Sequence, residues 1–245
     1  MKITALTAQN LNDPLGLECP RPGLSWQLRS GLKGDFQHAF RILAASRPEL
    51  LTEGKADLWD SGKVEERRNY AAVYGGMPLA SRQGVYWKVR VWDSREEASD
   101  WSETAYFEMG LLEPEDWKGS WIGRGDDFSG DKSMAPALAK RFPVKDIGGV
   151  RRARLYISGL GLFCASVNGQ AVTQALFEPG ESEFEKRVYY VVYDILPFLR
   201  EGENALGVIL GNGQYANYAV SPVMKLGDGT LSEKHRYQKD DTVYL

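Results

Sequence analysis

The feature that most constrains the fold is Arg151–Val172, a stretch in which apolar and polar residues alternate between turns. Its first apolar series is Ala153, Leu155 and Ile157, and its second is Phe163, Ala165 and Val167. A period of two residues is typical of a β-strand with one buried face. Asn168-Gly169 follows the second series and predicts a two-residue hairpin, because a type I′ turn needs positive φ at both central positions. The stretch therefore predicts the start of an antiparallel sheet.

The first half of the chain shows the same period around Gly84–Asp93. Its strand face consists of Val85, Trp87, Val89 and Val91. A second strand is expected within Phe36–Ala45, with Phe40, Ile42 and Ala44 pointing inward. Short strands separated by turns over about 100 residues indicate a β-sandwich, and the phrase from Tyr86 to Phe107 resembles the end of a fibronectin type III domain.

Longer phrases resemble the front of bacterial α-L-rhamnosidases. In the first half these are Asp13–Gly16, Pro20–Pro22, Leu24–Trp26, Leu58–Gly62 and Trp101–Glu103. In the second half they are Phe177–Gly180, Lys186–Tyr190, Tyr193–Ile195 and Gly202–Gly213. The run Tyr156–Tyr215 is the most specific part, and it resembles the sandwich domain that precedes the catalytic barrel of these enzymes. The resemblance implies a fibronectin type III-like domain followed by the rhamnosidase N-terminal domain.

We therefore expect an all-β chain of two consecutive antiparallel β-sandwiches. The first is fibronectin type III-like and covers residues 1–110, residues 111–119 form a linker, and the second covers residues 120–245. The second resembles a jelly-roll or galactose-binding sandwich. Such a sandwich needs more strands than the pattern supplies after Tyr215, so its C-terminal part is expected to be incomplete and the chain to be a fragment.

Composition excludes several classes of partner. The net charge of −3 gives no basic excess for binding nucleic acid, and no apolar run is long enough to cross a membrane. The N-terminus lacks the apolar core of a secretory signal. Two isolated cysteines, Cys19 and Cys164, fit a reducing compartment, so we expect a cytoplasmic protein.

The chemistry implied by the resemblance is inverting hydrolysis that releases terminal α-L-rhamnose, with acid and base supplied by an (α/α) barrel. Such a reaction needs two carboxylates facing one bond. The sequence shows no helical periodicity of barrel length, so we predict no catalytic residue here, and no cofactor. Glu181, Glu183 and Glu185 alternate as on the solvated face of a strand.

Metal binding is not predicted either. Asp126, Asp127 and Asp131 lack the ligand spacing of a calcium loop, and neither His38 nor His235 belongs to a cluster with zinc spacing.

Contact with carbohydrate is predicted at one place, Gly211–Tyr215. Asn212 and Gln214 offer hydrogen-bond donors and acceptors, and Tyr215 offers a ring to stack on a sugar. The family pattern has Trp where Gln214 stands. The alternative is that this loop braces the domain against the barrel.

Three functions follow as hypotheses. The first is an accessory, non-catalytic N-terminal portion of an α-L-rhamnosidase, with the catalytic barrel as its partner and rhamnose-containing glycosides as ligands. The second is a free-standing carbohydrate-binding module, and the third is a scaffold or adhesion protein of generic sandwich domains. The oligomeric state stays open.

Overall fold

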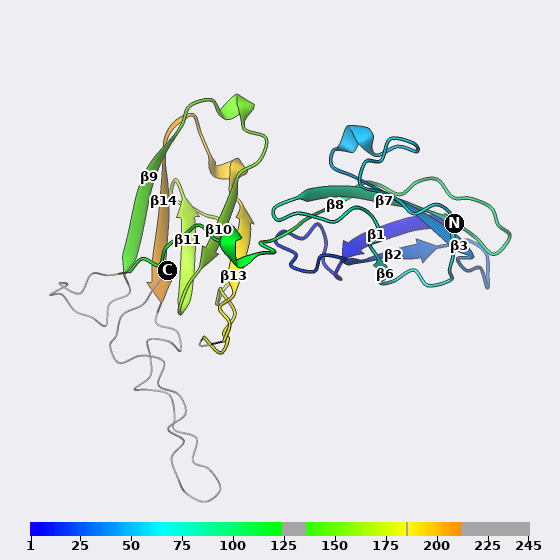
Figure 1. The fold of residues 1–245 in the computed structure, drawn as a ribbon, viewed down its shortest axis with the longest axis horizontal. Helices are drawn as coiled ribbons and strands as arrows, with labels where there is room; N and C mark the ends of the chain where they lie inside the picture. The colour runs from blue at the N-terminus through cyan, green and yellow to red at the C-terminus, as the bar shows by residue number, and fades with distance from the viewer. Residues whose placement is uncertain (124–135, 185, 212–245) are drawn as a thin grey trace, which may run out of the picture. The chain divides into compact units, whose positions relative to one another are not determined.

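The chain divides into two compact units, Met1–Lys118 and Gly119–Leu245. The structure is a computed structural model that describes residues 1–123, 136–184 and 186–211 (Figure 1). Within these residues the helices are single 3₁₀ turns, and none is long and apolar enough to span a membrane. Their bounds are η1 (Pro48–Leu50), η2 (Pro114–Asp116), η3 (Ile147–Gly149) and η4 (Leu196–Phe198). The predicted all-β class is confirmed.

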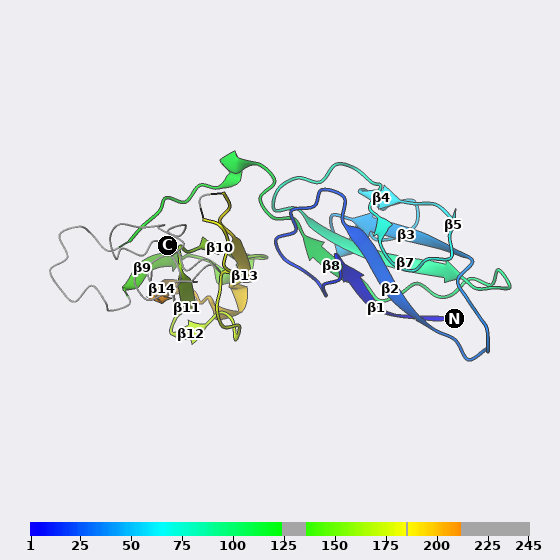
Figure 2. The same cartoon turned by 90° about the horizontal axis from the view of Figure 1, so that it is seen from below.

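The first unit is a sandwich of two antiparallel layers. One layer has the order β1-β2-β6, with bounds β1 (Lys2–Ala8), β2 (Gly23–Arg29) and β6 (Ala72–Val73). The other has the order β4-β3-β7-β8, with β5 also paired to β3. Its bounds are β3 (Ala39–Ala45), β4 (Trp59–Asp60), β5 (Val64–Glu65), β7 (Gly84–Trp92) and β8 (Ala105–Glu108). The first layer lies below the second in Figure 1 and in front of it in Figure 2.

The core of this unit is built from the predicted alternation. The predicted face of β7, Val85, Trp87, Val89 and Val91, is fully buried. It packs with Leu24 and Trp26 of β2, so both layers contribute to one apolar cluster. Burial of large apolar side chains is the main stabilising term in such a sandwich.

Strand β3 is buried on both faces, which the alternation did not predict. Phe40, Ile42 and Ala44 point into the main core as expected. Leu43 and Ala45 are also fully buried, in a smaller cluster with Leu51. The segment 46–57, which carries η1, covers this outer face of the sheet (Figure 1). The sequence signal for a one-sided strand was therefore incomplete.

The second unit contains a four-stranded sheet, β12-β11-β14-β9, and a two-stranded sheet, β10-β13. The strand bounds are β9 (Ala137–Val144), β10 (Arg154–Ser158), β11 (Leu162–Val167), β12 (Gln170–Ala171), β13 (Tyr190–Asp194) and β14 (Gly202–Gly211). All described pairs of these strands are antiparallel. The core combines Ile157 of β10 and Tyr193 of β13 with Phe163, Val208 and Leu210 of the larger sheet.

The hairpin predicted at Asn168-Gly169 is confirmed. Val167 pairs with Gln170 across the turn, and the two central residues have φ of 51° and 80°. The Asn168 side chain also donates to the backbone oxygen of Phe198 at 2.9 Å and to Oδ1 of Asn204 at 2.8 Å. Asn204 is 1% exposed, so the turn is tied to a buried amide at the start of β14.

Candidate functional site

The predicted carbohydrate contacts Asn212, Gln214 and Tyr215 lie outside the described residues. The structure does describe the strand that leads to them. β14 ends at Gly211, which pairs with Leu162 at the start of β11. The described residues that surround this end of β14 therefore border the candidate site.

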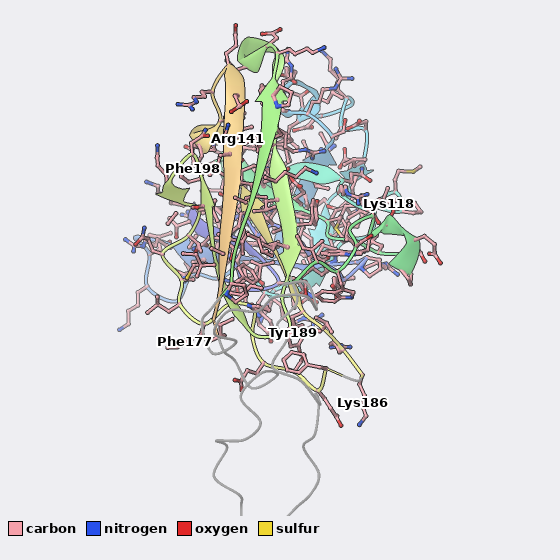
Figure 3. All side chains as sticks on the ribbon, turned by 90° about the vertical axis from the view of Figure 1, so that its left-hand side faces the viewer. Lys118, Arg141, Phe177, Lys186, Tyr189 and Phe198 are labelled. Atoms are coloured by element: carbon pink, nitrogen blue, oxygen red, sulfur yellow. The ribbon has the colours of Figure 1, made fainter. Side chains whose placement is uncertain are left out.

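A long loop between β12 and β13 reaches the same end of the unit. The backbone N–H of Phe163 donates to the oxygen of Glu178 at 2.8 Å, which joins the loop to the start of β11. Figure 3 shows Phe177 on one side of this end of the unit and Lys186 and Tyr189 on the other, with Arg141 and Phe198 towards the opposite end. The loop thus becomes part of the surface around Gly211.

Glu178 and Tyr193 form a polar contact between the loop and β13. The Tyr193 hydroxyl donates to Oε2 of Glu178. Tyr193 is 8% exposed, and burial, followed by the hydrogen bond and the charge of Glu178, raises its pKa well above the usual range. Tyr193 therefore stays protonated and acts as a donor, and the pair holds the loop against β13. Glu178 carried no predicted role, because its partner is 15 residues away in a different element.

The loop exposes a few large apolar side chains among its polar ones. Leu176 and Phe177 are 75% and 76% exposed, and Tyr189 is 44% exposed. Phe177 also has φ of 61°, a conformation that bulky residues rarely adopt. Glu178, the next residue, is held by the two hydrogen bonds described above. We define Leu176 and Phe177, which are adjacent in the chain, as the apolar loop surface.

The acidic stretch after Gly180 does not form the predicted strand. Residues 181–184 lie outside any strand, and the backbone N–H of Lys186 donates to the oxygen of Glu183 at 2.7 Å. The ammonium of Lys186 lies 2.9 Å from Oε2 of Glu183. Glu185 is outside the described residues. Glu181 and Glu183 are exposed, as expected for a solvated face, but the backbone here forms a turn and not a strand.

The next feature is the arrangement of the residues that could bind a metal ion. The described ranges contain no group of three or more His, Cys, Asp or Glu side chains that could hold a metal ion. Asp126, Asp127, Asp131 and His235 lie outside those ranges. His38 lies 3.9 Å from Oε1 of Glu96.

Two family models match the chain in sequence order. Residues 3–113 match the Rha78A-like N-terminal immunoglobulin domain, and residues 148–242 match the α-L-rhamnosidase N-terminal domain. The two units are homologous to the two N-terminal domains of α-L-rhamnosidases. The fibronectin type III-like expectation agrees with the first match, because both domain types share the sandwich architecture.

Several α-L-rhamnosidases resemble this chain over most of its length. One from Formosa agariphila is 36% identical over 222 residues, which are 83% of this chain and 23% of the relative. One from Alteromonas sp. is 38% identical over 216 residues, with the same two shares. The chain therefore spans about a quarter of the length of the curated α-L-rhamnosidases it matches.

Solved α-L-rhamnosidase structures show the same fold. The enzyme from Dictyoglumus thermophilum superposes with a TM-score of 0.80 at 34% identity, over 88% of this chain and 25% of that one. The enzyme from Aspergillus terreus superposes with a TM-score of 0.78 at 26% identity, over 99% and 26%. These homologues are larger enzymes with catalytic regions beyond the part that matches this chain.

Proposed function

We propose that this chain is the accessory N-terminal portion of an α-L-rhamnosidase, a glycoside hydrolase that releases terminal α-L-rhamnose. In this proposal a catalytic (α/α) barrel outside the two domains cleaves the glycosidic bond, and the two sandwiches support it. The observation that carries the proposal is the consecutive match of both domains, in order, to enzymes about four times as long.

The apolar loop surface supports a packing role. Contiguous exposed apolar side chains on a soluble protein commonly mark a contact with another protein part. Phe177 is 76% exposed and lies beside Leu176, which is 75% exposed. We propose that this surface contacts the catalytic region of the parent enzyme.

A chimera tests the proposal directly. The N-terminal region of the Dictyoglumus thermophilum enzyme is replaced by this chain at the matched boundary, and hydrolysis of an aryl α-L-rhamnoside is measured. We expect the chimera to be active and this chain alone to show no turnover. Turnover by the chain alone, or equal activity of a chimera carrying an unrelated pair of β-sandwiches, contradicts the supporting role.

The loop contact has its own variant pair. Phe177→Ser is expected to lower the melting temperature of the chimera while leaving that of the isolated chain unchanged. The control Leu32→Ser alters a side chain that is 50% exposed in the first unit and is expected to change neither. Equal destabilisation of the isolated chain by Phe177→Ser shows that Phe177 packs within the chain itself, which refutes the contact.

A further inference from the structure

The first unit contains an open groove at one side of its sandwich, within the described residues. The groove encloses about 380 Å³ between β5, an outer strand of one layer, and β6, the outer strand of the other. Binding pockets for small molecules begin at roughly 300 Å³, so this space suits a ligand the size of one or two sugar rings. No function assigned above uses it.

The lining combines aromatic surface with a few polar groups. Phe40, which is 6% exposed, and Trp59 are among the apolar lining residues, and Tyr70, which is 60% exposed, lies at the mouth. The charged residues of the lining are Glu65, Glu66 and Arg68. Aromatic rings that pack against the apolar face of a ring, beside carboxylates that accept hydroxyl protons, form the chemistry that binds sugars.

The charge of the lining disfavours an anionic ligand. Arg68 is neutralised by Glu66, with Nη2 of the arginine 2.8 Å from Oε2 of the glutamate. The carboxylate of Glu65 has no hydrogen bond or ion pair to the described residues, so it is available as an acceptor. The lining therefore has no cationic excess for an anion, and the exposed carboxylate of Glu65 is the group left to accept hydroxyl protons.

A buried polar network holds the wall of the groove in place. Gln37 is 2% exposed and donates through Nε2 to the backbone oxygens of Glu66 and Arg68, both at 2.8 Å. Its Oε1 accepts from the indole N–H of Trp26 at 2.9 Å. Asn69 is tied to the same tryptophan, with Nδ2 2.8 Å from the Trp26 backbone oxygen. A wall fixed by buried hydrogen bonds is preorganised, so little conformational entropy is lost when a ligand binds.

We propose that this groove binds a neutral monosaccharide, with Tyr70 as the stacking ring and Glu65 as the hydroxyl acceptor. This site is separate from Asn212–Tyr215 and from the apolar loop surface. It does not depend on the supporting role proposed above, although the choice of L-rhamnose as first probe does.

The test is a titration of the full 245-residue chain with L-rhamnose, and in parallel with D-glucose, followed by amide chemical shifts in NMR. We expect saturable shifts at residues 64–73, with affinity in roughly the millimolar range that a small, open site supplies. Tyr70→Ala and Glu65→Ala are each expected to weaken binding about tenfold, the effect of losing one stacking or hydrogen-bonding partner.

Two matched controls separate this groove from the rest of the chain. Tyr189→Ala removes an exposed ring of the second unit, and Glu49→Ala removes an exposed carboxylate of the first unit outside the groove, so both are expected to bind as the unchanged chain does. Absence of shifts at residues 64–73 with both sugars overturns the proposal. Sugar binding that is abolished by Tyr189→Ala but unchanged in Tyr70→Ala also overturns the proposal. Because hydrolysis by the chimera is a separate measurement, failure here leaves the supporting role standing.

Discussion

Gln37→Leu is expected to destabilise the first unit strongly although it replaces a polar residue by an apolar one of similar size. Gln37 is buried and makes three hydrogen bonds, to the indole N–H of Trp26 and to the backbone oxygens of Glu66 and Arg68. Leucine can make none of them. The indole N–H, on a side chain that is 2% exposed, is then left without an acceptor.

The magnitude follows from these three bonds. An unpaired buried donor costs about 1–3 kcal/mol, and each lost bond to a partly buried carbonyl about 0.5–1.5 kcal/mol. Burial of the apolar leucine side chain offsets roughly 1 kcal/mol of this cost. The free energy of unfolding is therefore expected to fall by about 1–5 kcal/mol, which lowers the melting temperature by roughly 4–20 °C for a unit of this size.

Differential scanning calorimetry of the full chain measures the effect. The control is Gln27→Leu, which replaces an exposed glutamine of β2. Like other surface substitutions, it is expected to change the free energy of unfolding by no more than about 0.5 kcal/mol. Trp26→Phe removes the indole N–H, so in that background Gln37→Leu is expected to lose about 1–3 kcal/mol of its effect. The reasoning is refuted if Gln37→Leu lowers the free energy of unfolding by less than about 0.5 kcal/mol. It is also refuted if the effects of Gln37→Leu and Trp26→Phe on this free energy simply add in the double variant.

The core makes a simpler test: Leu24→Ala, at a fully buried position, is expected to lower the free energy of unfolding by about 2–5 kcal/mol, and Leu11→Ala, at a 55% exposed one, by less than about 0.5 kcal/mol in urea denaturation. Asn204→Leu removes an amide that donates to the Arg200 backbone oxygen at 2.8 Å and accepts from the Arg200 N–H at 3.0 Å. This variant is expected to destabilise the second unit by about 2–4 kcal/mol in the same assay. An unchanged unfolding transition contradicts the role of that amide. Hydrogen bonds from Ser30 and then Ser94 lower the pKa of Asp35 from 3.8 to about 2. A depressed folded-state pKa contributes stability above pH 3.8 that is lost as the pH falls towards 2, so Asp35→Asn is expected to flatten the acid limb of the stability curve, and an unchanged limb contradicts this.

Local patterns predicted several of the longer strands. The alternation in Gly84–Trp92 and in Leu162–Val167 identified their buried faces, and Asn168-Gly169 identified its hairpin, since each signal depends only on neighbouring residues. The acidic stretch after Gly180 shows where such a signal stops. Glu181 and Glu183 are exposed, as their alternation predicted, but no described strand pairs with residues 181–184.

The functional surfaces were harder to predict. The contact residues proposed from the sequence, Asn212, Gln214 and Tyr215, lie outside the described residues and stay predictions. Neither Glu178 nor Tyr70 was assigned a role. One is joined to Tyr193 across 15 residues, and the other lines a groove together with Phe40, which is 30 positions earlier in the sequence.

The amino-acid sequence by itself determined the class of fold, the faces of the main strands, the position of the hairpin and the family of both domains. Each of these follows from residues close together in the chain or from phrases read in order. Tertiary structure alone decided that β3 is buried on both faces, that Gln37 and Asn204 are buried polar centres, and that a groove lies between β5 and β6. The physical reason is that burial and hydrogen-bond satisfaction depend on which distant segment covers a side chain, and Gln37 finds its partners 11, 29 and 31 residues away.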